Sequence, residues 1–271
     1  MADPVRYSRM TAAELRETFL IEDLFSPGVV EAVYVDLDRT VIGSAVPTKR
    51  ALELGTYGEL KSSYFAERRE LGILNIGGAG AVIAAGTRYE LEHLSCLYIG
   101  RGTEQISFAS AHSRDPARYY LLSYAAHCTH PTRLATKLQA EAVDLGTTAA
   151  CNKRRVYKYV HAGGIQSCQL VMGFTELKTG SAWNTMPPHT HMRRSEVYLY
   201  FHLDARDRVV HLMGPPQETR HIIVADRQAV ISPGWSIHAG FGTSAYAFCW
   251  GMGGENQDYS DMDAVAVTSL R

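Results

Sequence analysis

Short runs of β-prone hydrophobic residues, separated by glycine, proline or aspartate, recur along most of the chain. In the first half, the predicted strands are residues 33–37, 72–76, 81–83, 96–99, 105–108 and 119–124. In the second half, they are residues 156–159, 167–176, 197–202, 209–213, 221–224, 229–231 and 245–250. Many short strands, with turn signals about every 8–12 residues, are typical of an all-β sandwich or barrel.

Three segments depart from this strand pattern. Thr11 and Glu14 form a capping-box sequence, which predicts a short helix that ends near Leu20. Residues 133–141 have no decisive periodicity and fit either a strand or a short helix. A polar junction at residues 146–155 separates the two runs of strands. The pattern predicts an all-β fold of two consecutive barrel or jelly-roll halves, residues 1–150 and 151–271, with a short N-terminal helix.

Composition indicates a globular protein without a strongly charged partner. Of the 271 residues, 46% are hydrophobic and 20% are charged, and 27 basic against 28 acidic residues give a formal net charge of −1. We therefore expect no nucleic acid and no anionic membrane as a partner. The five cysteines form no Cys-x-x-Cys pair, residues 1–10 contain no signal-peptide core, and no stretch reaches the ~20 apolar residues of a membrane span. These features predict a cytoplasmic protein.

A His-x-His pair is the most informative motif. His189 and His191 follow two prolines, which favour extended backbone. Side chains two residues apart in a strand point to the same side, so both imidazoles should face one point. Glu196 lies five residues after His191, an odd offset that requires a turn or bulge to bring its carboxylate to that side. His238 follows a β-run and a tight turn, where an antiparallel neighbour can bring it to the same place.

Three imidazoles and one carboxylate suit zinc, although iron, manganese, nickel and cobalt accept the same ligand types. A site without sulfur ligands usually leaves room for water or a substrate oxygen, which favours a catalytic ion over a structural one. We therefore predict that His189, His191, Glu196 and His238 hold one divalent ion, zinc, per chain. Chance is the competing explanation, because the chain contains 11 histidines.

The remaining histidines form no comparable group. They are mostly isolated, which favours surface or hydrogen-bonded side chains: His93, His112, His127, His130, His161, His202, His211 and His221. His127 and His130 flank Cys128 and could imitate a ligand pair on a helix, but no carboxylate partner is nearby. We expect no second metal site there.

The spacing of the four predicted ligands resembles the two short motifs of the cupin superfamily, whose small β-barrels hold a metal on three histidines and one glutamate. Longer runs are similar to the 5-keto-4-deoxyuronate isomerase family of cupins. These runs are residues 180–187, 189–194, 196–201, 231–238 and 251–257. The first half matches in length and general character, and residues 152–155 at the junction are its clearest anchor.

This resemblance implies a bicupin fold, in which the first half has no metal and the second half binds zinc on the four residues. It implies a cytoplasmic homohexamer with a small-molecule uronate substrate. It also implies an aldose–ketose isomerisation in pectin breakdown, from 5-dehydro-4-deoxy-D-glucuronate to 3-deoxy-D-glycero-2,5-hexodiulosonate. A metal that chelates the C1 and C2 oxygens would act as a Lewis acid, with either a hydride shift or a base to move the proton.

Glu255 and Glu218 are the candidate bases, with Tyr198 or His202 as a relay. Glu255 follows a glycine-rich strand exit, where backbone can approach a ligand closely. The alternative interpretation of Glu255 is a solvated loop carboxylate, and the residues alone do not decide between these two.

Arg193 and Arg194 are candidates for a bidentate clamp on the substrate carboxylate. Ordinary surface or intersubunit salt bridges explain these two arginines equally well. The tryptophans near the motifs, Trp183, Trp235 and Trp250, are interpreted as core and pocket walls.

Two classes of function compete with this isomerase hypothesis. One is another cupin enzyme, either an iron-dependent dioxygenase or a phosphosugar isomerase. A phosphosugar enzyme needs a phosphate cradle, and no glycine-rich loop that opens a helix is visible in the sequence. The other class is a sugar-binding or storage module that binds uronate without converting it.

Overall fold

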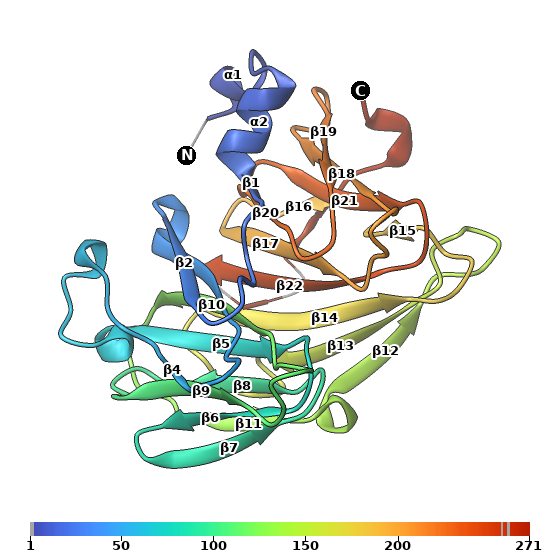
Figure 1. Ribbon diagram of the computed structural model, residues 1–271. Coiled ribbons are helices and arrows are strands. Elements are labelled where there is room, and N and C mark those ends of the chain that lie inside the picture. The colour runs from blue at the N-terminus through green and yellow to red at the C-terminus, as the bar shows by residue number, and fades with distance from the viewer. Residues whose placement is uncertain (1–2, 256, 259–260) are drawn as a thin grey trace. The chain divides into compact units, whose positions relative to one another are not determined.

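The computed structural model describes residues 3–255, 257–258 and 261–271 (Figure 1). Asn256, part of the last matching run, lies outside the described residues. The chain forms two compact units. Unit 1 comprises Met1–Glu22, Ala142–Lys158 and Gly173–Arg271, and unit 2 comprises Asp23–Glu141 and Tyr159–Met172. The units differ from the predicted linear halves because segments from each half contribute to the other unit.

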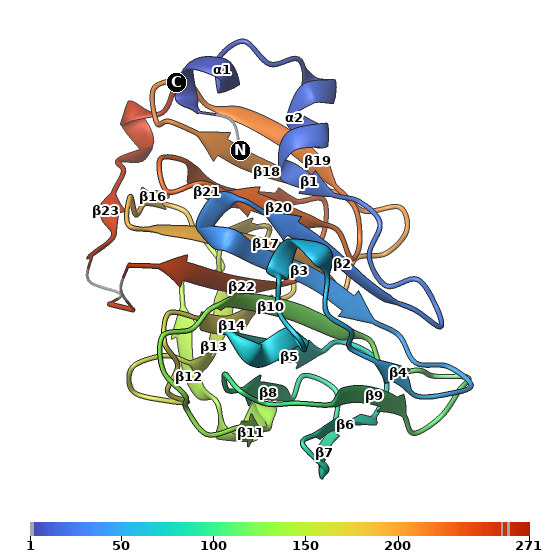
Figure 2. The same ribbon diagram turned by 90° about the vertical axis from the view of Figure 1, so that its left-hand side faces the viewer.

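Unit 1 contains both α-helices, α1 (Pro4–Tyr7) and α2 (Ala12–Phe19), and most residues of a seven-stranded sheet. The order in this sheet is β1 (Leu20–Ile21), β20 (Ala229–Ser232), β17 (Arg194–Phe201), β22 (Ala247–Gly254), β14 (Val171–Leu177), β13 (Arg154–Val160) and β12 (Glu141–Leu145). A four-stranded sheet has the order β15 (Trp183–Asn184), β21 (Ile237–Gly242), β18 (Val209–Gly214) and β19 (Arg220–Val224). The short strands β16 (His189–Thr190) and β23 (Asp263–Ala264) pair with each other (Figure 2).

Unit 2 is built from two further sheets. The six-stranded sheet has the order β11 (Arg133–Ala135), β8 (Cys96–Ile99), β5 (Arg69–Asn75), β10 (Tyr119–Ala125), β3 (Thr40–Ala45) and β2 (Val30–Val35). The four-stranded sheet has the order β4 (Leu52–Glu53), β9 (Ile106–Ser110), β6 (Gly80–Ala84) and β7 (Thr87–Leu91). The short 3₁₀ helices of the chain are η1 (Leu37–Arg39), η2 (Gly58–Leu60), η3 (Phe65–Glu67), η4 (Lys137–Gln139) and η6 (Val267–Ser269).

The two units repeat one strand-pairing pattern. In unit 2, β5 pairs with β8 and β10, while β6 pairs with β7 and β9. In unit 1, β17 pairs with β20 and β22, while β18 pairs with β19 and β21. All of these pairs are antiparallel. Consecutive strands therefore fold in the same way in each unit, although the sequence shows no strict internal repeat.

The N-terminal capping box is confirmed, since the Glu14 N–H donates to Thr11 Oγ1 at 3.3 Å and the Thr11 N–H donates to Glu14 Oε2 at 2.7 Å. The undecided segment 133–141 begins with strand β11 and continues with helix η4. The predicted strand at 167–176 is wrong at its start, because β14 begins only at Val171. The preceding backbone N–H groups donate to the buried carboxylate of Glu70 and not to a neighbouring strand.

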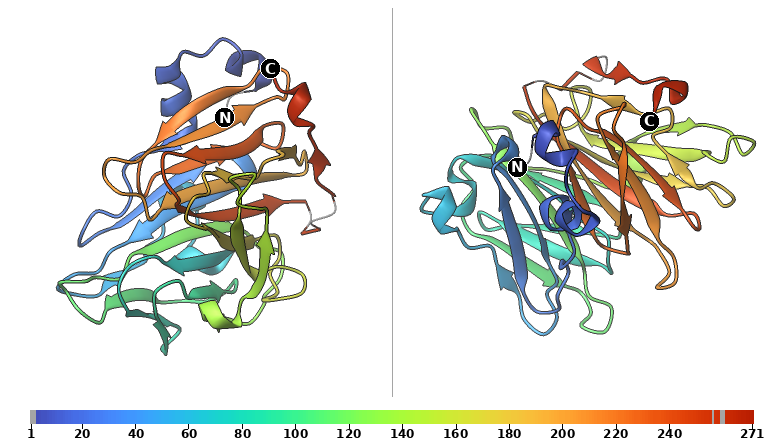
Figure 3. Two further views of the ribbon diagram at one scale, coloured as in Figure 1. Left: turned by 90° about the vertical axis from the view of Figure 1, so that its right-hand side faces the viewer. Right: turned by 90° about the horizontal axis from the view of Figure 1, so that it is seen from above.

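The N-terminal helices pack on strands from the other end of the chain within unit 1 (Figures 1 and 2). The Tyr7 hydroxyl donates to the Met213 carbonyl at 2.9 Å, and the Trp235 ring lies 5.2 Å from the Tyr7 ring. The Arg220 guanidinium donates to carbonyls of the segment between the helices. The C-terminal segment reaches the β18–β19 hairpin as well, where the Thr219 N–H donates to the Arg271 carbonyl (Figure 3).

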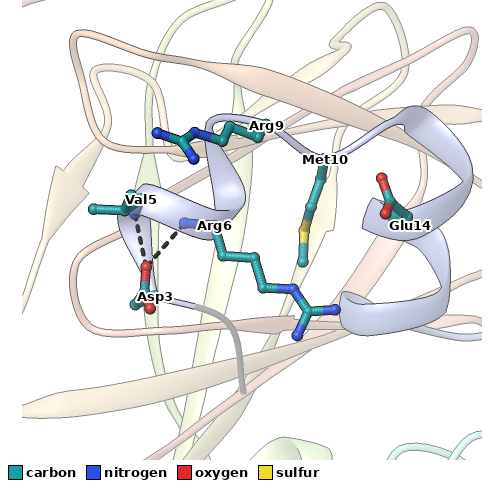
Figure 4. Close-up of a pocket in the computed structure, with 6 residues that line it drawn as sticks. All are labelled: Asp3, Val5, Arg6, Arg9, Met10 and Glu14. Carbon is teal, nitrogen blue, oxygen red and sulfur yellow. Dashed lines mark hydrogen bonds between the residues drawn. The ribbon is translucent and has the colours of Figure 1, made fainter.

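A pocket of about 330 Å³ lies beside these two helices (Figure 4). Its lining residues are Asp3, Val5, Arg6, Arg9, Met10 and Glu14. The Asp3 carboxylate accepts from the Val5 and Arg6 N–H groups at the start of α1 and so caps this helix. Among the described residues, no helix is long and apolar enough to cross a membrane.

Candidate metal centre

The turn predicted between His191 and Glu196 is present. The Arg194 N–H donates to the His191 carbonyl at 3.1 Å, and strand β17 starts at Arg194. The His189 and His191 rings, two residues apart, have centroids 5.5 Å from each other. Strand β17 then carries Glu196 inward, where its side chain is almost completely buried.

Four side chains converge in unit 1, from strands β16, β17 and β21 and from the turn between β16 and β17. Glu196 Oε2 lies 2.8 Å from His238 Nε2 and 3.1 Å from His191 Nε2. His238 Nε2 lies 3.1 Å from His189 Nε2. One potential ligand atom from each of the four residues lies within 4.8 Å of the others. The structure therefore brings together the full set of ligands predicted from the sequence.

Hydrogen bonds to the second ring nitrogens orient two of these imidazoles. His191 Nδ1 lies 2.9 Å from the Arg194 carbonyl oxygen, which can only accept, so Nδ1 carries the proton. The Nε2 lone pair of His191 then faces the centre of the group. His238 Nδ1 lies 3.3 Å from the Ser232 hydroxyl, a contact that holds this ring in place.

Burial and neighbouring charges shift the pKa values of this group in opposite directions. Burial, reinforced by His238, lowers the pKa of His189 to about 3. Burial opposes ionisation of Glu196, but His238 and His191 outweigh it and hold the pKa of that carboxyl well below its usual range. Burial also opposes protonation of His191, whose pKa is nevertheless raised by Glu196. The group is therefore an ionised carboxylate surrounded by imidazoles.

This donor set fits a divalent cation. Two imidazole Nε2 atoms only 3.1 Å apart repel each other when both are unprotonated, unless a proton or a cation lies between them. A buried carboxylate beside three imidazoles supplies the negative charge and the nitrogen donors that such an ion needs. His189, His191, Glu196 and His238 can thus hold one metal ion.

Near the four residues lies a group of polar side chains, of which sequence reasoning named only Tyr198, as a possible relay. The Tyr198 hydroxyl lies 3.0 Å from Thr185 Oγ1, and its ring lies 5.3 Å from the His238 ring. The Tyr200 hydroxyl lies 2.7 Å from His211 Nδ1. Tyr198 and Tyr200 lie two and four residues after Glu196 in β17. Strand periodicity therefore places them on the same side as Glu196.

This polar group continues around a glycine. Asn184 Nδ2 donates to the Tyr246 hydroxyl at 2.7 Å. A Cβ built on Gly240 would lie 2.6 Å from Asn184 Nδ2, 2.8 Å from the Tyr200 hydroxyl and 2.9 Å from the Tyr246 hydroxyl. Glycine is therefore needed at position 240 for these polar groups to approach each other. His211 Nε2 and Asn184 Oδ1 are buried and have no hydrogen-bond partner among the described residues.

The two candidate arginines interact with acidic residues of the C-terminal segment. Arg194 is fully buried, and its Nη2 lies 2.6 Å from Asp261 Oδ1. Arg193 is 63% exposed, and its Nε lies 3.8 Å from Glu255 Oε2. These contacts match the salt-bridge alternative for both residues. Through its carbonyl, Arg194 also orients His191.

The candidate bases lie at the surface. The Glu255 side chain is 71% exposed and pairs with Arg193, and the Glu218 side chain is 52% exposed and lies 3.6 Å from Arg220. Among the described residues, neither glutamate belongs to the group of four. His202 is exposed just after the end of β17.

The three tryptophans pack against neighbouring side chains of unit 1. Trp250 is buried and donates through Nε1 to Thr175 Oγ1 at 3.1 Å. Trp235 packs against Tyr7, and the Trp183 ring lies 4.9 Å from the Phe241 ring.

Comparison with known proteins places this site in a family. A family model described as the KduI/IolB family matches residues 23–268. The chain belongs to the KduI/IolB family. Within this family, it is 53% identical to a protein of Kineococcus radiotolerans, over 99% of this chain and 97% of that one. It is 52% identical to a protein of Lachnoclostridium phytofermentans, over 100% and 98% of the two chains. Both relatives are named 4-deoxy-L-threo-5-hexosulose-uronate ketol-isomerase.

Solved structures of low sequence identity share the fold of this KduI/IolB family member. An IolB-like protein from Salmonella typhimurium has a TM-score of 0.72 at 13% identity, over 91% of this chain and 96% of that chain. A mutant of Bacillus subtilis oxalate decarboxylase has a TM-score of 0.64 at 9% identity, over 91% and 79% of the two chains. The predicted all-β bicupin fold is confirmed.

Proposed function

We propose that this chain is a zinc-dependent 4-deoxy-L-threo-5-hexosulose-uronate ketol-isomerase of pectin and uronate breakdown. The convergence of three imidazoles and one carboxylate carries this proposal, in a chain about half identical to relatives of that name over nearly its full length. The reaction moves the carbonyl of a 4-deoxy-5-keto hexuronate from C1 to C2. One hydrogen moves from C2 to C1 and the hydroxyl proton moves from the C2 oxygen to the C1 oxygen, so that substrate and product are isomers.

His189, His191, Glu196 and His238 would hold the zinc ion. When bound, it supplies a Lewis acid that polarises the substrate oxygens and makes the C2 proton more acidic. The Arg194 carbonyl, through its hydrogen bond with His191, fixes an imidazole in the orientation that ligation needs. The Arg194–Asp261 ion pair holds that carbonyl in place.

Tyr198 is the side chain that we propose holds a proton next to the reacting carbons. Its ring lies 5.3 Å from the His238 ring. Burial raises the pKa of Tyr198 well above its usual range, with a further contribution from Glu196, so the hydroxyl keeps its proton at neutral pH. It can therefore donate to a substrate oxygen. Glu255 and Glu218, in contrast, are exposed at the surface.

Arg154 is the cation that we propose binds the substrate carboxylate, in place of Arg193 and Arg194. Burial lowers the pKa of Arg154, while the charges of Tyr198 and Tyr246 act in the opposite direction. Its Nη1 donates to the Asn152 carbonyl at 3.0 Å. Among the described residues, Arg154 has no carboxylate partner. A partly buried guanidinium without a carboxylate partner is suited to a carboxylate ligand.

The test is an isomerisation assay on the 4-deoxy-5-keto uronate, with metal analysis of the same protein. Metal-stripped protein should lose turnover, and added zinc should restore it. Arg154→Gln should raise KM about 10–100-fold, the effect of losing a charged hydrogen bond. The matched control Arg155→Gln changes a half-exposed arginine whose Nε lies 3.7 Å from Asp144 Oδ1, and should leave KM unchanged.

Other outcomes of this assay would reject the proposal. Normal turnover by metal-free protein would exclude the metal mechanism. Oxygen consumption that depends on ferrous iron would indicate a dioxygenase, and uronate binding without turnover would indicate a binding module.

The family resemblance also implies a homohexamer in the cytoplasm, and we propose both. Light scattering on the purified protein tests the hexamer, since a mass other than six times 29.9 kDa would contradict it. Cell fractionation tests the location.

A further inference from the structure

A second set of soft metal ligands lies in unit 2. Cys128 Sγ is 3.5 Å from Cys168 Sγ, although 40 residues separate them in the chain. These two sulfur atoms and one imidazole nitrogen of His127 all lie within 4.8 Å of one another. His130 Nε2 lies 3.4 Å from Cys128 Sγ. The group therefore unites two thiols with one imidazole, and a second imidazole lies beside them.

The loop that carries Cys168 is fixed independently of its thiol. Glu70 is fully buried, and its carboxylate accepts from the N–H groups of Cys168 at 2.7 Å, Gln169 at 2.8 Å and Leu170 at 2.8 Å. The Tyr98 hydroxyl donates to the same carboxylate at 2.8 Å. Buried, charge-assisted hydrogen bonds of this kind hold a loop in one conformation. The position of the Cys168 sulfur is thus built into unit 2.

The backbone of Cys128 faces the sulfur of Cys168. The Cys128 N–H donates to Cys168 Sγ at 3.4 Å, and the Cys168 thiol donates to the Cys128 carbonyl at 3.3 Å. Burial raises the pKa of Cys168 to about 11, so without a metal the sulfur stays protonated at neutral pH. Metal binding would release that proton, because only the thiolate is a good ligand.

We propose that Cys128, Cys168 and His127 bind a soft divalent cation of the zinc type, with His130 next to the fourth coordination position. Tetrahedral zinc, with Zn–S of about 2.3 Å and Zn–N of about 2.0–2.1 Å, separates its ligand atoms by about 3.5–3.8 Å. The sulfur pair at 3.5 Å is close to the ~3.8 Å expected for two sulfur ligands of such an ion. A disulfide would engage only the sulfurs and would leave both imidazoles without a role.

The ion would join two stretches of unit 2 that are distant in sequence. Residues 127–130 follow strand β10, and Cys168 precedes strand β14. The unit is assembled from Asp23–Glu141 and Tyr159–Met172. His127, Cys128 and His130 lie in the first segment, and Cys168 lies in the second. A cross-link between them restricts the unfolded chain and thereby stabilises the unit. This site is independent of the proposed isomerase centre.

Cobalt substitution of the full-length protein tests the proposal. A Co²⁺ ion bound by thiolates gives a sulfur-to-metal charge-transfer absorption, which the centre at Glu196 cannot give because it contains no sulfur. We expect the wild type to bind two cobalt ions per chain and to show this absorption. Cys128→Ser and Cys168→Ser should each lose the absorption and one ion. The control Cys151→Ser, at another exposed cysteine, should keep both.

Three results would overturn the proposal. One is a wild type that binds a single cobalt ion without the charge-transfer absorption. Another is protein whose Cys128 and Cys168 thiols react with a thiol reagent only after reduction, which would assign them to a disulfide. The third is unchanged cobalt affinity in His127→Ala, where a lost ligand should weaken binding by more than about 10-fold.

Discussion

Unit 1 and unit 2 share a strand-pairing pattern but differ in the chemistry of corresponding positions. Glu196 of β17 pairs with Ser232, the last residue of β20. Leu71 of β5 pairs with Ile99, the last residue of β8. The same position in the pattern thus carries a carboxylate in unit 1 and a leucine in unit 2.

The corresponding strands β21 and β9 show the same contrast. Strand β21 contributes His238 and Gly240, whereas β9 contributes Ile106 and Phe108 to a hydrophobic core. This core contains further leucine, isoleucine and valine side chains from β3, β5, β6 and β8. The fold therefore does not require polar residues at these positions. In unit 1 they replace apolar packing, and their burial is tolerable only with hydrogen bonds or a bound ion.

The largest expected effect follows from removing the carboxylate that distinguishes unit 1. Glu196→Gln should abolish metal binding at this centre and lower isomerase activity by about 10³-fold or more, since a Lewis acid contributes several kcal/mol to the transition state. Metal content and kcat measure this. The control His221→Ala, at an exposed histidine of β19, should change neither. Full metal content in Glu196→Gln would remove the distinction between the units.

The next effect concerns the apolar counterpart in unit 2. Leu71→Ala should destabilise the protein by about 2–5 kcal/mol, because it leaves a cavity in a fully buried core. Urea unfolding measures this loss, and the metal content of unit 1 should stay unchanged. Leu138→Ala is the control, since Leu138 is 97% exposed and should give a change close to zero. Equal losses for both variants would contradict the role assigned to the core.

Gly240 offers a smaller test of the polar interior. Gly240→Ala should destabilise the protein by about 1–3 kcal/mol, because the new Cβ would overlap the amide and hydroxyl groups that meet there. Thermal unfolding measures the shift. Gly55→Ala is the matched control, since a Cβ at Gly55 meets no atom within 4 Å. An unchanged melting temperature in Gly240→Ala would mean that these polar groups can separate freely.

The smallest effect is a pH dependence of stability. Burial lowers the pKa of His211 from its usual 6.5 to about 3, and His238 reinforces this shift. As the pH falls from about 6.5 towards 3, the unfolded chain binds a proton that the folded protein excludes. Stability should therefore decrease by up to about 1.4 kcal/mol per pH unit. Urea unfolding at pH 5 and 7 measures the slope, which His211→Asn should reduce; an equal slope in that variant would contradict a neutral, buried His211.

Sequence reasoning predicted the local features well. The capping box at Thr11 and the strand at Cys96–Ile99 are present as expected, because short-range patterns determine them. It failed where a distant side chain competes with the local pattern. The backbone N–H groups of Cys168 to Leu170 donate to the Glu70 carboxylate, so β14 begins later than predicted. The polar neighbours of the metal centre, such as Asn184 and His211, come from other strands and were missed for the same reason.

By itself, the sequence determined the four candidate metal ligands, because three of them lie within eight residues and their spacing is set by strand and turn geometry. It also determined the family, through long runs of specific residues. Only the tertiary structure decided which arginines have a carboxylate partner. Arg194 pairs with Asp261, 67 residues away, whereas Arg154 pairs with no carboxylate among the described residues. The tertiary structure likewise brought Cys168 to Cys128. Contacts between distant segments depend on how strands pair, and no local pattern of residues encodes that pairing directly.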